Sequence, residues 1–373
     1  MCTSFFSIIV PCYNQAHFLG DCISSIQSQS FTDWEVIIIN DGSTDNTVEI
    51  AGQFASIDAR IKLVNKPNGG LSSARNAGMA VAQGKVLQFL DADDLLLRNC
   101  LKSVSDYFAA EPQTSILRVG YQYIDEKHTH IIHQVRPSNK VFIISDVFTN
   151  NLGPCHSIFI KHDLAREIGD FDETLKSAED WDFWIRAAKA GAIIKSISYI
   201  LVAYRYVSNS MSRDGIRMYG AQKEVIMRGP KQDGRIKIHS NHNIESYEDV
   251  SVGIKRQMLM CLGVIVMQGK INEAVKLYKA EHDQFRWSVS PAEFTHMYSY
   301  LSFRYWNKND EPDKIFNEFY PRFDMFFEVL GLSKKEHQAA MKAIFINPIR
   351  IRNRNLYGKI IGKLVNYLAD KLN

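Results

Sequence analysis

The stretch VLQFLDADDLLL, Val86 to Leu97, joins two apolar runs through a cluster of carboxylates. Asp91, Asp93 and Asp94 repel one another there, and a plain loop has no need of them. Divalent cations that prefer oxygen ligands, such as Mn²⁺ or Mg²⁺, bind carboxylates at a rigid position and keep sites open for substrate phosphates. Because Asp91 and Asp93 alternate along a chain leaving a strand, they point to the same side and can share a cation. We therefore predict a metal site at Asp91 and Asp93; the alternative is a solvated acidic turn.

The residues before this stretch alternate strand and helix patterns. Continuous apolar runs predict strands at 5–11, 34–40, 61–66 and 85–90, and helical spacing predicts helices at 17–30, from about 48, and at 71–84. Continuous rather than alternating apolar strands, linked by helices, indicate an α/β fold with a mostly parallel sheet covered on both faces. Ligands of such sheets lie beyond the carboxyl ends of the strands. Pro11, Asp41 and Asp91 follow strands, so we expect them to share one crevice.

The chain of 373 residues is long enough for two domains. A strand is predicted in SILRVGYQYID, 115–125, and a helix at 179–191. We expect an α/β domain at 1–228, a polar linker at 229–248, a helical region at 249–339 and a basic tail at 340–373. Within the helical region, MLMCLGVIVMQGKINEAVKLYKA resembles a single helix–turn–helix pair of tetratricopeptide type, without a second copy.

The composition excludes several classes of protein. A net charge of +3 predicts no nucleic-acid partner. Six scattered cysteines without a CxxC pair favour a reducing compartment over disulfides or structural zinc. The N-terminus lacks the basic segment of a signal peptide, and we expect no run of about 18 apolar residues to span a membrane. These features predict a cytoplasmic protein.

Two further motifs lie around the expected crevice. VIIINDGSTDNT places Asn40, Asp41 and Asp45 at a strand-to-helix turn, where they could equally cap the next helix. NGGLSSARNAGMAVAQG supplies a glycine-rich loop and Arg75 ahead of a helix of small residues. Such loops let a backbone approach a phosphate, although they are common.

Taken together, these residues resemble the inverting family 2 glycosyltransferases, which have the GT-A fold. The matching motifs occur in family order: Pro11-x-Tyr13-Asn14, NDGSTD, NGGLSSARNAG, DADD and AEDWDFWIRAAKAG. The resemblance covers about residues 4 to 215. It implies transfer of a sugar from a nucleotide-sugar donor, a UDP-sugar by expectation, to a glycan, lipid-linked or protein acceptor. Mn²⁺ or Mg²⁺ would stabilise the leaving diphosphate.

The resemblance also implies roles for individual residues. Those of the donor site are Asp41 at the nucleotide base, Pro11, Tyr13 and Asn14 in the same pocket, Arg75 near the ribose and phosphates, and Asp91 with Asp93 at the metal. Those of the acceptor site are Asp180 as catalytic base, with Glu179, Trp181 and Trp184 as acceptor contacts, the two indoles stacking on a sugar. A carboxylate base is needed because the attacking hydroxyl must lose its proton.

The sequence departs from the family pattern at two positions. Asn40 stands where many members carry an acidic residue, and Val207 stands where many carry a histidine that binds the metal or phosphate. Arg205 or Arg213 could neutralise the diphosphate instead.

Two other functions remain open on these residues. A sugar nucleotidylyltransferase would carry a glycine-rich, basic loop after the first strand, and PCYNQAHF has neither glycine nor lysine. A non-catalytic nucleotide-sugar-binding or scaffold protein would have no need of the acidic cluster and of the Glu-Asp motif.

Asp180 has a structural alternative. SAED, Ser177 to Asp180, fits a capping box in which Ser177 caps the helix and Asp180 reaches back to its amide. Catalysis is favoured because Phe183 and Trp184 give this side of the helix an apolar character, where a carboxylate is costly.

The tail at 340–373 has seven Lys and Arg residues against one Asp, a charge of +6. Its last 19 residues repeat apolar side chains every fourth position, which predicts an amphipathic helix. The helix could dock on the protein itself, lie on an anionic membrane at the inner face, or bind a protein partner.

Overall fold

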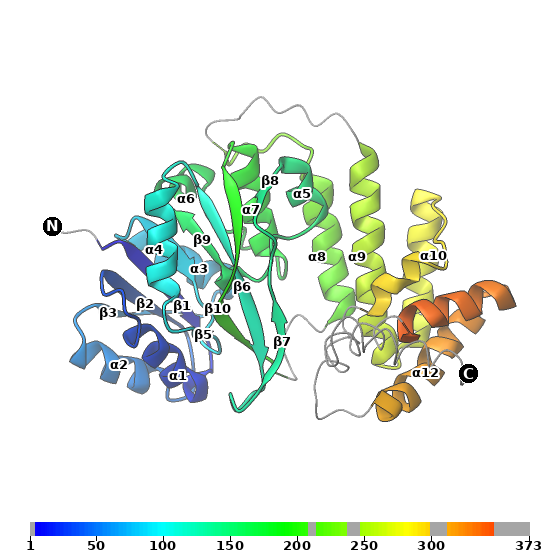
Figure 1. Cartoon of the computed structure of the whole chain (residues 1–373), viewed down its shortest axis with the longest axis horizontal. Coiled ribbons are helices and arrows are strands. Elements are labelled where there is room, and N and C mark those ends of the chain that lie inside the picture. The colour runs from blue at the N-terminus through cyan, green and yellow to red at the C-terminus, as the bar shows by residue number, and fades with distance from the viewer. Residues whose placement is uncertain (1–3, 208–213, 237–246, 299–311, 347–373) are drawn as a thin grey trace, which may run out of the picture. The chain divides into compact units, whose positions relative to one another are not determined.

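The computed structural model describes residues 4–207, 214–236, 247–298 and 312–346. The chain forms two compact units, one of residues 1–208 with 224–249 and one of residues 209–223 with 250–373. The first unit carries the sheet and the second is helical, as the sequence predicts (Figure 1). Of the predicted basic tail at 340–373, only residues 340–346 are described, and the amphipathic helix predicted in its last 19 residues lies outside the described residues.

The first unit is built on one 10-stranded sheet with the strand order β3-β2-β1-β4-β9-β6-β10-β5. Its strands are β1 (Phe6–Cys12), β2 (Trp34–Asp41), β3 (Ile61–Lys66), β4 (Val86–Phe89), β5 (Leu95–Leu96), β6 (Ile116–Ile124), β7 (Ile131–Val135), β8 (Lys140–Phe142), β9 (Ile158–Lys161) and β10 (Ile194–Arg205). The four strands predicted before the acidic cluster are β1 to β4, and they pair in parallel. β9 runs antiparallel between β4 and β6, where the sequence predicts no strand.

Helices cover both faces of the parallel strands. Residues of α1 (Ala16–Gln27), α2 (Thr47–Ile57) and α4 (Cys100–Ala110) share one buried cluster with Phe6, Ile8 and Val10 of β1. The alternate residue Ile9 points to the other face, against α3 (Leu71–Val81). Every residue of β1 and β2 is buried, which is why their sequences are apolar without alternation. The mostly parallel α/β fold is confirmed.

Gly78 sets the distance between α3 and β1. A Cβ atom there would lie 2.3 Å from Cγ2 of Ile9. We expect Gly78→Ala to destabilise the protein by about 1–3 kcal/mol through overpacking. Gly52 in α2 has no atom within 4 Å of an added Cβ, so Gly52→Ala should stabilise by about 0.5–1 kcal/mol through helix propensity. Denaturant unfolding of both variants measures this difference, and equal effects would contradict it.

The predicted linker, 229–248, begins as part of the first unit. Residues 229–236 follow α8 (Gly215–Arg228) and return to α7 (Glu179–Lys189). Arg235 donates to both carboxylate oxygens of Asp182 in α7, at 3.1 and 2.9 Å, and to Asp172 at 3.1 Å. The sequence does not predict these ion pairs of Arg235, because Asp172 and Asp182 are distant from it in the chain. Residues 237–246 lie outside the described ranges.

The second unit contains α9 (Tyr247–Met267), α10 (Ile271–Phe285), η3 (Glu293–Tyr298) and α12 (Pro312–Leu330). α9 and α10 form the predicted helix–turn–helix, with Gly269 at a φ of 78° in the turn. Val250–Met267 is long and apolar enough to cross a membrane, contrary to the sequence prediction, but 67% of it is buried inside the protein. Core helices of soluble proteins have the same character, so this stretch is weak evidence for a span.

Candidate functional site

The ends of β1 and β2 meet at one edge of the sheet, as predicted. Pro11 is buried within β1, and Tyr13 just beyond it is 51% exposed. Asn14 adopts a left-handed φ of 52°. Its side-chain oxygen accepts a hydrogen bond of 2.8 Å from the backbone N–H of Thr44. The motif PCYN therefore braces the turn after β2, and its two exposed residues are Tyr13 and Asn14.

Asp41 holds the glycine-rich loop. Its carboxylate accepts hydrogen bonds from Nζ of Lys66 at 2.5 Å and from the backbone N–H groups of Gly69 and Gly70 at 3.0 and 2.8 Å. Asp41 is 3% exposed. In this arrangement its carboxylate shapes the loop beside the crevice, and its contact with a nucleotide base stays a prediction.

The acidic turn after β4 splits into two parts. Asp91 has a side chain that is 31% exposed, whereas Asp94 is fully buried. Oδ1 of Asp94 accepts a hydrogen bond of 2.8 Å from the backbone N–H of Arg205. Oδ2 of Asp94 lies 2.6 Å from Nδ1 of His156, an ion-pair distance, although the two groups are not aligned as a regular hydrogen bond.

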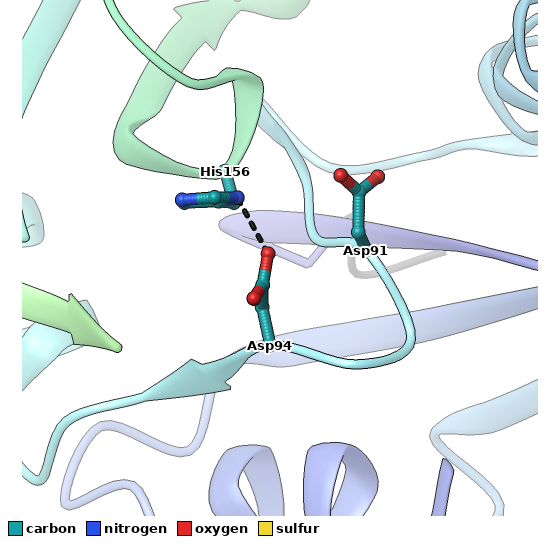
Figure 2. Close-up of side chains that lie close together, drawn as sticks. All are labelled: Asp91, Asp94 and His156. Atoms are coloured by element: carbon teal, nitrogen blue, oxygen red, sulfur yellow. Dashed lines mark ion pairs between the residues drawn. The ribbon is translucent and has the colours of Figure 1, made fainter. Parts of the chain in front are cut away.

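His156 is a site residue that the sequence analysis missed. It lies in η1 (Cys155–Ser157), before β9, and its ring meets the acidic turn (Figure 2). Ligand atoms of Asp91, Asp94 and His156 lie within 4.8 Å of one another. This group includes Asp91 but replaces the predicted Asp93 by Asp94 and His156. A lone histidine in GPCHSIFI carries no spacing signal that could have revealed it.

The charge of the turn suits a divalent cation. Burial, together with the carboxylates of Asp94 and Asp91, raises the pKa of Asp93 to about 8. Burial lowers the pKa of His156, but the carboxylate of Asp94 outweighs this and the net shift is upward. The carboxylates of the turn therefore disfavour one another's ionisation, and Asp93 gives up its proton with difficulty while no cation is bound. A bound cation would reverse the cost of ionising Asp93, so the residues present fit the predicted Mn²⁺ or Mg²⁺.

The side chain of Arg205 is hydrogen-bonded to the acidic turn after β4. Its Nε donates to the backbone oxygen of Asp93 at 2.8 Å, and its Nη2 donates to Asp21 at 3.1 Å. The residue is 3% exposed. The prediction that Arg205 could neutralise a diphosphate is therefore not supported by its position. The other candidate, Arg213, lies outside the described residues.

Arg75 connects the acidic turn to α7. Its Nη2 donates to Asp91 at 3.0 Å and its Nη1 donates to Glu179 at 2.7 Å. The guanidinium is 2% exposed. The family resemblance predicts Arg75 near the donor ribose and phosphates and Glu179 at the acceptor, whereas the structure pairs the two with each other. Asp91 and the first residue of α7 are thereby one arginine side chain apart.

The capping-box alternative for Asp180 is wrong. The residue that precedes α7 is Ala178, in a left-handed conformation with a φ of 57°, and no side chain caps the helix. The hydroxyl of Ser177 donates instead to the backbone oxygen of Lys176 at 2.8 Å. A non-glycine residue in this conformation is strained, and such strain clusters at functional sites.

Asp180 is held at the start of α7 by two donors to Oδ1. They are Nδ2 of Asn151 at 3.2 Å and the backbone N–H of Trp181 at 2.7 Å. Burial, followed by the neighbouring Glu179, raises the pKa of Asp180 to about 7, against the opposing effect of Arg75. A carboxylate with this pKa is suited to accept a proton near neutral pH. Asn151 is a further residue that the sequence did not reveal.

Trp181 and Trp184 are part of the core. Trp181 is 1% exposed and donates its indole N–H to the backbone oxygen of Val147 at 2.6 Å, in α5 (Ile144–Thr149). Trp184 is fully buried. Neither ring offers a face to a sugar, so the expected stacking role is wrong in this arrangement. Most other residues of α7 are buried as well, so the helix is enclosed on most sides.

Comparison with known proteins decides the family. The pattern of glycosyl transferase family 2 matches residues 7–168. The uncharacterized glycosyltransferase EpsJ of Bacillus subtilis (strain 168) is 31% identical over 269 residues, which are 69% of this chain and 76% of EpsJ. The chain belongs to glycosyl transferase family 2. The resemblance drawn from the sequence motifs is thereby confirmed, and so is the glycosyltransferase class.

Solved structures of glycosyltransferases share the fold of this family 2 member. S. aureus TarS 1–349 in complex with UDP-GlcNAc has a TM-score of 0.53 at 17% identity, covering 95% of this chain and 92% of that chain. The mannosyltransferase PcManGT of Pyrobaculum calidifontis, in complex with GDP-Man and Mn²⁺, has a TM-score of 0.54 at 14% identity, covering 96% and 89%. At these identities the likeness shows the GT-A-type fold alone.

Proposed function

We propose that this family 2 member is a metal-dependent, inverting glycosyltransferase that uses a nucleotide-sugar donor, with Asp180 as the general base. The observation that carries the proposal is the double contact of Arg75 with Asp91 and Glu179. It fixes the acidic turn and the start of α7 beside each other, as a reaction between a bound donor and a nearby hydroxyl requires.

On the donor side, Asp91 and Asp93 would hold the cation, and Tyr13 would lie against the nucleotide. When bound, Mn²⁺ or Mg²⁺ stabilises the negative charge that develops on the departing diphosphate. The loop that Asp41 braces carries the N–H groups of Gly69 and Gly70 beside the crevice. UDP-sugars are the first donors to test, because the TarS complex contains UDP-GlcNAc, and GDP-mannose is the second.

On the acceptor side, Asp180 takes the proton of the attacking hydroxyl. Both donors to Asp180 bind Oδ1, which assigns the proton to Oδ2. Attack on the face opposite the leaving diphosphate inverts the anomeric centre. The sugar passes through an oxocarbenium-like state, as in glycoside hydrolysis, so the base must lie near C1 without contacting the diphosphate.

A thermal-shift panel of nucleoside diphosphates and nucleotide sugars, with and without Mn²⁺, tests the donor class. A ligand at a hundred times its dissociation constant should stabilise the protein by about 2.7 kcal/mol. We expect one nucleotide series to give this shift only with Mn²⁺. A panel without any shift would contradict the proposal. A shift with no product, across acceptors, would instead support a non-catalytic binding protein.

The predictions about the acceptor, the membrane contact and the cellular location rest on the sequence alone. A glycan, a lipid-linked sugar or a protein could accept the sugar at Asp180. Contact with an anionic membrane through the tail at 340–373, and a cytoplasmic location, stay predictions.

A further inference from the structure

His156 is the one histidine that joins the acidic turn in the described residues, in a chain that carries Val207 where relatives often carry a metal-binding histidine. A direct reading makes His156 the replacement ligand, with Asp91 and Asp94. The contacts and burial of Asp94 argue against that reading.

Both oxygens of Asp94 already have partners. Oδ1 accepts from the backbone N–H of Arg205 at 2.8 Å, and Oδ2 lies 2.6 Å from Nδ1 of His156. The two side chains of the pair are 0% and 1% exposed. A catalytic cation must keep coordination positions open to its substrate. A fully enclosed pair offers no such position, whereas Asp91 is partly exposed.

Two further contacts hold His156 in place, one to its backbone and one to its ring. Its backbone oxygen accepts a hydrogen bond of 2.9 Å from the side chain of Gln88 in β4. The edge of its ring meets Tyr204 of β10 at a centroid distance of 4.6 Å. The backbone of His156 is thus tied to β4, and its imidazole packs against β10 beside Asp94.

Arg205 completes the arrangement from the other side. Its side-chain Nε donates to the backbone oxygen of Asp93, while its backbone N–H donates to Oδ1 of Asp94. Arg205 therefore holds the backbone of Asp93 and the carboxylate of Asp94, which leaves the carboxylate of Asp93 to turn toward a cation together with Asp91.

We propose that His156 is a positioning residue that anchors Asp94 and is not itself a metal ligand, so that Asp91 and Asp93 alone in this turn bind the cation. The inference rests on the metal-dependent function proposed above. Partners of this kind orient the ligands, and their loss typically costs about 10–100-fold in metal affinity.

Three variants separate an anchor from a ligand. In His156→Asn, the amide nitrogen can take nearly the place of Nδ1 and donate to Asp94, while the imidazole nitrogens that could bind a metal are removed. Asp94→Asn keeps the shape and an acceptor oxygen but removes the charge. Asp93→Asn removes a proposed ligand and supplies the reference loss. Binding of Mn²⁺ in the presence of UDP is measured from the electron paramagnetic resonance signal of free Mn²⁺, without turnover.

We expect His156→Asn and Asp94→Asn to bind Mn²⁺ within about tenfold of the unmodified protein, since only an outer contact changes, whereas Asp93→Asn loses binding. His156→Phe, which removes the donor altogether, should weaken binding by about 10–100-fold, and His156→Asn should restore it relative to that variant. If His156→Phe does not fold, the comparison of the three amide variants still distinguishes an anchor from a metal ligand.

Loss of Mn²⁺ binding in His156→Asn or in Asp94→Asn as severe as in Asp93→Asn would make those residues ligands and overturn the inference. Unchanged binding in a folded His156→Phe would also overturn it. Unmodified protein that binds no Mn²⁺ would overturn the proposed metal dependence together with the inference, so the two failures are distinguishable.

Discussion

Asp180→Asn is expected to lower turnover by about 10²-fold or more, because the amide keeps the hydrogen bonds of Asp180 but cannot take a proton. Donor affinity should hardly change, since the residue does not contact the acidic turn directly. Burial disfavours the ionised form of Asp180, so the amide should be at least as stable as the carboxylate near pH 8. Single-turnover rates, nucleotide binding and melting temperature measure the three effects separately.

The pH dependence follows from the same carboxylate. Its folded pKa of about 7 lies above the ordinary value of 3.8. Turnover should therefore rise with pH and level off above about 7, as Asp180 ionises. The linked stability has the opposite sign: the contribution of this group is full below pH 3.8 and is lost as the pH rises through 7. The stability difference between Asp180→Asn and the unmodified protein should vary within that window.

Asp182→Asn is the matched control in the same helical turn. Asp182 is 3% exposed and binds Arg186 and Arg235, so its loss should cost about 1–3 kcal/mol of stability while the folded fraction keeps most of its turnover. Full turnover in Asp180→Asn, or a loss of turnover in both variants in proportion to their stability, would remove Asp180 from the role of base.

The sequence predicts the parallel half of the sheet because strands that are buried on both faces have continuous apolar sequences. β1, β2 and β4 are buried at every residue, whereas β3 is buried only at Ile61. Pro11, Asp41 and Asp91 could be placed for that reason. Their partners could not, since Lys66 lies in β3, Gly69 in the loop after it and Arg75 in α3, and no periodicity specifies which carboxylate each of them meets.

The insertion of β9 explains why His156 was missed. A short apolar run such as Ile158–Lys161 does not specify its neighbours, and it pairs antiparallel with both β4 and β6. Only this placement brings η1 to the acidic turn. The same limit applies to Asn151, which reaches Asp180 across 29 positions of the chain.

The helix that carries Asp180 shows a different limit. A capping box is a local pattern, and SAED satisfies it, yet Ala178 takes a left-handed conformation and removes Ser177 from the cap position. The family resemblance implies that Trp181 and Trp184 stack on a sugar of the acceptor. They are buried because α5, with Val147, packs over α7, a contact that the sequence does not specify.

Asp93→Ala should abolish the Mn²⁺-dependent part of nucleotide binding, so that a stabilisation of about 2.7 kcal/mol at a hundred times the dissociation constant falls close to zero. The physical reason is the position of Asp93 between Asp91 and Asp94. Burial and these two neighbours raise its pKa to about 8, so without a cation the ionised form of Asp93 is disfavoured and contributes no stability. Metal-free Asp93→Ala should consequently melt no lower than the unmodified protein.

Asp106→Ala is the control, since its side chain is 61% exposed and pairs only with Lys102 at the surface of α4 among the described residues. Thermal melts of the three proteins with UDP, with Mn²⁺ and with both give the comparison. Asp106→Ala should keep the full Mn²⁺-dependent shift. An undiminished shift in Asp93→Ala would exclude this carboxylate as a ligand, and the site would then have to be sought at Asp91, Asp94 and His156.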